Sequence, residues 1–143
     1  MYQKDFILRM IEMVRDLIMG ILGLIKKGEF KQASDGIERI YVDILRQDSG
    51  FFQTIPPEKL TQTLIREHNY NNGHLEILAE LLNAEAELDL AQVKNKEALE
   101  FSQKSLILFE FIDNEQKTYS AERLAKIEAI RKRIITLRNE LKS

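Results

Sequence analysis

The chain has 143 residues, a net charge of −2, and neither cysteine nor tryptophan. That length suits one domain that buries a hydrophobic core without a covalent staple. The lack of cysteine excludes disulfides and thiolate metal sites, so we expect a cytoplasmic location. With only two Pro and six Gly, the composition favours helix, and we predict one all-α domain spanning residues 1–143.

The first predicted helix, residues 5–27, is apolar around most of its circumference. Its apolar run at residues 17–25 is far shorter than the ~20 residues that cross a bilayer. Acidic residues before that run argue against a secretion signal. We expect this helix to be covered on more than one side, by the inserted or the fourth helix of the same chain or, in a homodimer, by the first helix of a second chain. Its polar and glycine positions form one narrow stripe at helical spacing: Asp5, Arg9, Glu12, Asp16, Gly20, Gly23 and Lys27.

The next elements are predicted in chain order as a long helix and a short one. Gly28 ends the first helix, and the second runs over residues 30–47. Phe51 and Phe52 are expected to lie in a connection. Two consecutive prolines then open a short inserted helix over residues 56–67.

Three longer helices complete the prediction of about six. Asn72 is the expected N-cap of a helix from residue 73 to about residue 92, and Asn95 is expected to open one that runs to about residue 112. Ser120 is expected to open the last helix, which ends near residue 141. Short turns force neighbouring helices to run antiparallel, which predicts hairpins within residues 5–47 and 73–112.

Two segments share the pattern of the second helix of a tetratricopeptide (TPR) hairpin. Ala33 and Ala98 are each followed by small or apolar residues four and seven positions later, and both alanines are expected where paired helices come closest. Twelve residues earlier, the first helix of such a hairpin carries a small residue. Ala86 meets that requirement in the second unit, whereas the first has Ile21 next to Gly20.

These motifs carry a resemblance to a known family. Together with Asp5-Phe6-Ile7-Leu8-Arg9 and Gly73-His74-Leu75-Glu76-Ile77-Leu78, they make residues 4–112 similar to a bacterial family of unknown function with TPR-like folds. The resemblance implies a right-handed array of two hairpins (1–47 and 73–112) with an inserted helix and a capping helix at residues 120–142. By analogy it also implies binding of a protein or peptide.

Motifs for catalysis or nucleotide binding are missing from the sequence. There is no cysteine nucleophile, no Gly-x-Ser-x-Gly turn and no phosphate loop. We therefore expect a protein that is not an enzyme, with no catalytic residues, no cofactor and no metal.

One set of side chains could form a metal site: Glu67, His68, His74 and Glu76 offer two imidazoles and two carboxylates. The two histidines lie six residues apart across a loop rather than on one helix face. A polar loop with an exposed or hydrogen-bonded histidine is the simpler interpretation. A helical protein that binds a small ligand or metal through Glu67, His68 and His74 is the alternative function.

Charge is unevenly distributed along the chain. Residues 121–143 hold seven Lys or Arg against three Glu, a net charge of +4 that leaves −6 for the remainder. Nucleic-acid binding is disfavoured because no aromatic residue follows Tyr119 to stack on bases. We interpret the last helix as packing on the acidic body, although a short coiled coil would show the same stripe. The residues expected to face inward are Leu124, Ile127, Ile130, Ile134, Leu137 and Leu141. The acidic residues of the fourth helix are expected on a solvated face: Glu80, Glu85, Glu87 and Asp89.

The leading hypothesis is a non-enzymatic helical module for protein–protein interaction. It predicts a groove lined by exposed polar and aromatic side chains without a convergent titratable cluster. The expected partner is an unknown protein or peptide rather than a membrane.

Overall fold

The computed structural model describes residues 2–116 and 119–142, with the side chains of residues 2–5 outside that description. All regular structure in these residues is helical, which confirms the all-α prediction. None of the described helices is both long enough and apolar enough to cross a membrane. The elements are α1 (Tyr2–Lys26), α2 (Phe30–Ile40), the π-helical turn η1 (Tyr41–Leu45), α3 (Ser49–Gln53), the 3₁₀ turn η2 (Pro57–Lys59), α4 (Leu60–His68), α5 (Asn72–Ala91), α6 (Asn95–Glu115) and α7 (Ala121–Lys142).

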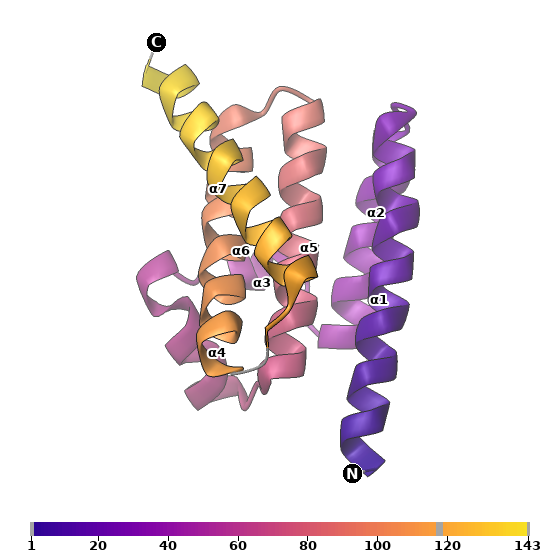
Figure 1. Ribbon diagram of the computed structural model, residues 1–143. Coiled ribbons are helices and arrows are strands. Elements are labelled where there is room, and N and C mark those ends of the chain that lie inside the picture. The colour runs from indigo at the N-terminus through magenta and orange to yellow at the C-terminus, as the bar shows by residue number, and fades with distance from the viewer. Residues whose placement is uncertain (1, 117–118, 143) are drawn as a thin grey trace.

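Helix α5 lies at the centre of the arrangement. It packs against α1 and α2, which form a hairpin on one side, and against α6 on the other (Figure 1). The last helix, α7, packs across α6, and α4 also contacts α6. Figure 1 shows the α1–α2 hairpin standing beside the rest of the molecule, with the N-terminal turns of α1 extending beyond α2. Every residue of α5 from Leu75 to Leu82 is buried, because helices cover this stretch on several sides.

The turn between α1 and α2 is made by Gly28, as predicted. Its φ of +78° lies in the left-handed region that glycine adopts without steric cost. Ala33 is fully buried. The side chain of Ile21 lies where a Cβ on Gly36 would come within 3.2 Å of it, so α2 supplies the small residue at this contact.

Two predicted N-caps are wrong by one residue. Asn71, not Asn72, caps α5: its side chain accepts the backbone N–H of His74 at 3.0 Å, and the His74 Nδ1 accepts the backbone N–H of Asn71 at 3.2 Å. Lys94 rather than Asn95 stands at the N-cap of α6, where no side chain caps the helix. The Asn95 side chain instead donates to Glu140 of α7 at 3.2 Å. Ser120 accepts the backbone N–H of Arg123 at 3.1 Å, as expected for a residue that opens α7.

The segment expected to be a connection forms a short helix instead. Asp48 caps α3 by accepting the backbone N–H of Phe51 at 2.9 Å. Phe52 is fully buried, and its ring stacks on that of Tyr41 at 5.5 Å between centroids. The described residues therefore contain seven α-helices rather than about six.

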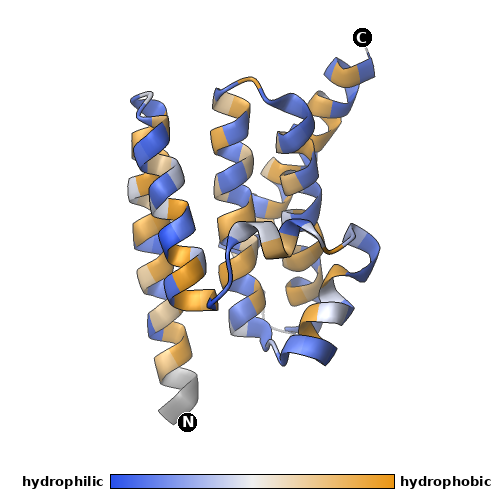
Figure 2. Cartoon of the chain, turned by 180° about the vertical axis from the view of Figure 1, so that it is seen from behind, coloured by the Kyte–Doolittle hydropathy of each residue, from blue (hydrophilic) through white to orange (hydrophobic). Residues whose placement is uncertain are grey.

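Helix α1 packs on α2, its hairpin partner, and on α5, the fourth predicted helix, as expected, but the described residues leave its outward face exposed. Ile18 and Ile21 are buried against the body, whereas Leu17 is 47% exposed and Met19 is 70% exposed. Figure 2 shows hydrophobic segments on the α1–α2 hairpin also along the side that faces away from α5. Among the described residues, no other group lies within 4 Å of a Cβ built on Gly20 or Gly23, so none of the described backbone approaches there.

The basic helix α7 packs on the acidic body, which confirms that interpretation. Ile127, Ile130, Ile134 and Leu137 are buried, while Leu124 is partly buried and Leu141 is exposed, so only the last residue of the predicted stripe fails to face inward. Ion pairs link α7 to α5 and α6: Lys126 with Glu80, Arg133 with Glu87 at 2.6 Å, and Arg123 with Asp113 at 2.9 Å.

The prediction that the acidic residues of α5 lie on a solvated face is wrong for Glu80. Its side chain is buried between Lys126 of α7 and Arg15 of α1, whose Nε lies 3.5 Å from the carboxylate. Arg15 also donates to Glu76 at 2.5 Å. Burial of a carboxylate needs such charge partners, and α1 and α7 supply them from both ends of the chain.

Replacing Ala98 with Leu is expected to lower the free energy of unfolding by about 1 to 3 kcal/mol. Ala98 is fully buried in α6, so the larger side chain has no space to occupy. Urea unfolding measures the change. The control is Ala129→Leu on the exposed face of α7, where we expect less than about 0.5 kcal/mol. Equal stability of the two variants would contradict the close packing at Ala98.

Candidate functional site

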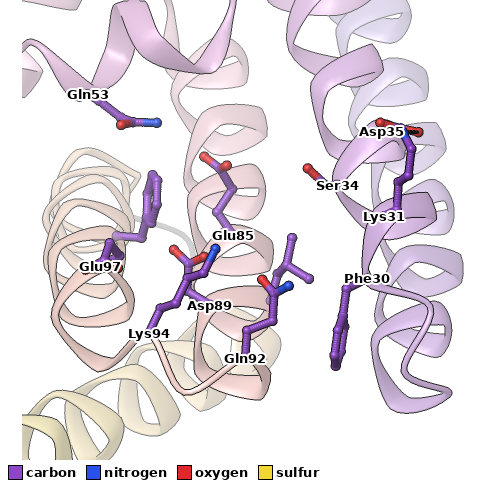
Figure 3. A pocket seen from close by; sticks show the side chains of 12 residues that line it. Phe30, Lys31, Ser34, Asp35, Gln53, Glu85, Asp89, Gln92, Lys94 and Glu97 are labelled. Atoms are coloured by element: carbon purple, nitrogen blue, oxygen red, sulfur yellow. Dashed lines mark hydrogen bonds and ion pairs between the residues drawn. The ribbon is translucent and has the colours of Figure 1, made fainter.

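A groove of about 600 Å³ runs between the first hairpin and the α5–α6 hairpin. Figure 3 shows its side chains projecting from α2 on one side and from α5, α6 and the turn between them on the other, with Gln53 of α3 at one end. We call this feature the central groove. It is lined by Phe30, Lys31, Ser34, Asp35, Gln53, Glu85, Leu88, Asp89, Gln92, Lys94, Glu97 and Phe101.

The most perturbed ionisable group of the central groove is Glu85. The pKa of its carboxyl is raised to about 7, mainly by burial and also by the nearby charges of Asp89 and Glu38. The Tyr41 hydroxyl donates to Glu85 Oε2 at 2.8 Å, which opposes this rise. The same carboxylate and the burial of the ring hold the pKa of Tyr41 well above its usual value. Glu85 is therefore about half ionised near neutral pH.

Other charges of the groove are mixed but mainly acidic. Burial raises the pKa of Asp89, with Lys94 acting in the opposite direction. On the α2 wall, Lys31 pairs with Asp35 at 3.2 Å. Counting Glu97 as well, four carboxylates face two lysines around the groove. A bound basic group would meet negative potential close to Glu85 and Asp89.

Apolar surface lies next to these carboxylates. Phe30 at the start of α2 and Phe101 of α6 are both partly buried and pack on the core, each leaving part of its ring at the groove. Leu88 of α5 also lines the groove. The central groove thus combines aromatic contact area with charged groups, the combination found where proteins bind peptide segments.

This lining matches the predicted groove in part. Polar and aromatic side chains are present as expected, but Glu85 and Asp89 form a titratable pair, which the prediction excluded. The sequence contains no local signal for this pair. Tyr41 and Glu85 are 44 residues apart, and only the packing of η1 on α5 brings them together.

The loop residues considered for metal binding have other contacts. The His68 ring packs edge-on against Phe51 at 5.0 Å, and the His74 ring lies 5.0 Å from that of Tyr70 while its Nδ1 caps α5. The Glu76 carboxylate accepts a hydrogen bond from Arg15. Within residues 2–116 and 119–142, no group of three or more His, Asp or Glu side chains is placed to hold a metal ion.

Replacing Glu85 with Gln is expected to change how stability depends on pH. An unfolded carboxyl loses its proton near pH 4.5, whereas folded Glu85 keeps it up to about pH 7. Its contribution to stability is therefore complete below pH 4.5 and falls as the pH rises to 7, by up to about 1 kcal/mol per pH unit. The variant should lose this slope.

The measurement is urea unfolding at pH 5, 6, 7 and 8, read as the difference between the wild type and Glu85→Gln. Glu97→Gln, an exposed carboxylate of the same groove, is the control and should keep the slope of the wild type. Parallel pH profiles for wild type and Glu85→Gln would contradict the raised pKa.

Comparison with known proteins identifies no relative of this chain. No family model, no curated protein and no solved structure matches the chain.

Proposed function

We propose that this chain is a non-enzymatic protein interaction module that binds a peptide segment of a partner in the central groove. The observation that carries the proposal is the lining of that groove, where two phenylalanines and the carboxyls of Glu85 and Asp89 line the same cavity. A peptide with a basic side chain beside an apolar one would satisfy both parts of the lining. The proposed setting is the cytoplasm.

A TPR-like arrangement is part of the same proposal. It is supported by the contacts of α5 with both helices of the first hairpin and with its own partner α6. It is also supported by the full burial of Ala33, Ala86 and Ala98, which occupy three of the four positions where the pattern requires a small residue. Helical arrays of this kind bind partners along a groove formed by successive hairpins.

Selection from a peptide library tests the proposal. Wild-type protein is used to select from displayed random peptides, and the selected peptides are measured by fluorescence anisotropy against Asp89→Lys. We expect them to contain Lys or Arg beside apolar residues and to bind the variant at least about tenfold more weakly.

Glu115→Lys is the matched control, because it makes the same charge change at an exposed site on α6 outside the groove. Its affinity should equal that of the wild type. Failure to select any peptide, or equal binding by Asp89→Lys, would contradict the proposed use of the groove.

A further inference from the structure

Helix α1 carries a second apolar face that the rest of the chain leaves exposed. Its buried face is formed by Ile11, Val14, Ile18, Ile21 and Ile25. Four further apolar residues, at steps of four, three and four, form what we call the outer stripe: Phe6, Met10, Met13 and Leu17. Phe6, Met13 and Leu17 are 60%, 45% and 47% exposed, and Met10 is partly buried. A stripe with this spacing is typical of a helix that pairs with another helix.

Beside the outer stripe lies a groove of about 320 Å³ between α1 and α2. Met13, Leu17 and Ile21 line it from α1, and Ile40 and Ile44 line it from the α2 side. Arg39 and Asp43 stand at the same groove and contribute one charge of each sign. An apolar helix can therefore lie along the hairpin without meeting a net charge.

We propose that the outer stripe pairs with the outer stripe of a second copy of this chain, in an antiparallel arrangement about a two-fold axis. With the axis beside residues 11 and 12, Phe6 packs against Leu17 of the second copy and Met10 packs against Met13 of the second copy. Each contact occurs twice because the interface is symmetric. The four stripe residues thus cover each other in four layers.

Charge complementarity favours a second copy of this chain as the partner that binds the outer stripe. Arg9 and Asp16 are exposed and each immediately precedes a stripe residue, so both lie on the same flank of the stripe. In the proposed register Arg9 lies opposite Asp16 of the second copy, and Asp16 lies opposite Arg9 of the second copy. A parallel pair would instead place the two flanks on opposite sides of the interface, so Arg9 and Asp16 of the two copies would not meet. A strongly acidic or basic partner would match only one of the two charges.

Sedimentation equilibrium between about 1 and 500 μM tests the proposal. We expect the dissociation constant of a dimer with a short helical interface to fall within this concentration range. We expect the wild type to dimerise and Leu17→Glu to raise the dimer dissociation constant more than about tenfold, because the carboxylate would be buried against an apolar surface. Met19→Glu is the matched control: Met19 is 70% exposed on another face of α1, and its variant should dimerise like the wild type. Circular dichroism of each variant confirms that the helices are intact.

A charge exchange tests the register. Arg9→Asp and Asp16→Arg should each weaken the dimer about tenfold, since every pair occurs twice, and the double variant should restore the affinity of the wild type. A wild type that stays monomeric throughout the concentration range would overturn the proposal. A dimer unaffected by Leu17→Glu, or a double variant no tighter than the single ones, would overturn it as well.

Discussion

Replacing Phe52 with Ala is expected to lower the free energy of unfolding by about 3 to 5 kcal/mol. The ring is fully buried and contacts three other aromatic rings, those of Tyr41, Phe51 and Tyr70. The backbone carbonyl of Phe52 accepts a hydrogen bond from the buried Lys104 Nζ at 3.1 Å. Truncation would leave a cavity between α3, η1 and α6 that these rigid neighbours cannot fill.

The control for this experiment is Phe51→Ala, which removes the same number of atoms one position away. Phe51 is only partly buried, so we expect a loss smaller by at least about 1 kcal/mol. Urea unfolding with tyrosine fluorescence gives both values. If the two variants lost equal stability, α3 would not be anchored through Phe52.

Replacing Lys126 with Met is expected to cost about 3 kcal/mol of stability. The variant keeps the aliphatic stem that packs near the ring of Phe109, where Lys126 Nζ lies 5.9 Å from the centroid. It removes the ammonium group that pairs with the buried carboxylate of Glu80. Arg15 then remains as the charge partner of Glu80, at 3.5 Å.

Lys132→Met is the control, since Lys132 is exposed on the same helix, and it should change stability by less than about 0.5 kcal/mol. The double variant Glu80→Gln with Lys126→Met should recover most of the loss, because the buried carboxylate that lost its ammonium partner is replaced by a neutral amide. Chemical denaturation of the wild type, Glu80→Gln, Lys126→Met and the double variant forms a double-mutant cycle. No coupling between the two positions would mean that Glu80 does not hold α7 on α5.

The central groove and the outer stripe are separate surfaces, which lets the two proposals be tested independently. The central groove opens between the α1–α2 hairpin and α5, whereas the outer stripe lies on α1 beside the separate groove between α1 and α2. Leu17→Glu should therefore leave peptide binding unchanged, and Asp89→Lys should leave the dimer unchanged. A homodimer formed through α1 would carry two grooves and could bind two peptide segments at once.

The candidate site was only partly predictable from the sequence. A helical interaction module predicts a groove with aromatic and polar lining, and Phe30 and Phe101 fit that expectation. The raised pKa of Glu85 was not predictable, because it results from burial by residues distant in the chain. A carboxyl on a helix has the same sequence signature whether it faces solvent, as was expected of Glu80, or another helix.

Local patterns in the sequence determined the helices. Glycine at residue 28, paired prolines at 56 and 57 and apolar residues at helical spacing were sufficient to place most boundaries within a few residues, since these signals act over one or two turns. Tertiary structure alone decided which faces are covered. It made a helix of the segment around Phe52, buried Glu80 between α1 and α7, and left Leu17 exposed although its neighbour Ile18 is buried. The physical reason is that burial depends on which helices meet across long sequence separations, and an apolar helix such as α1 shows the same periodicity whether its second face meets its own chain or another.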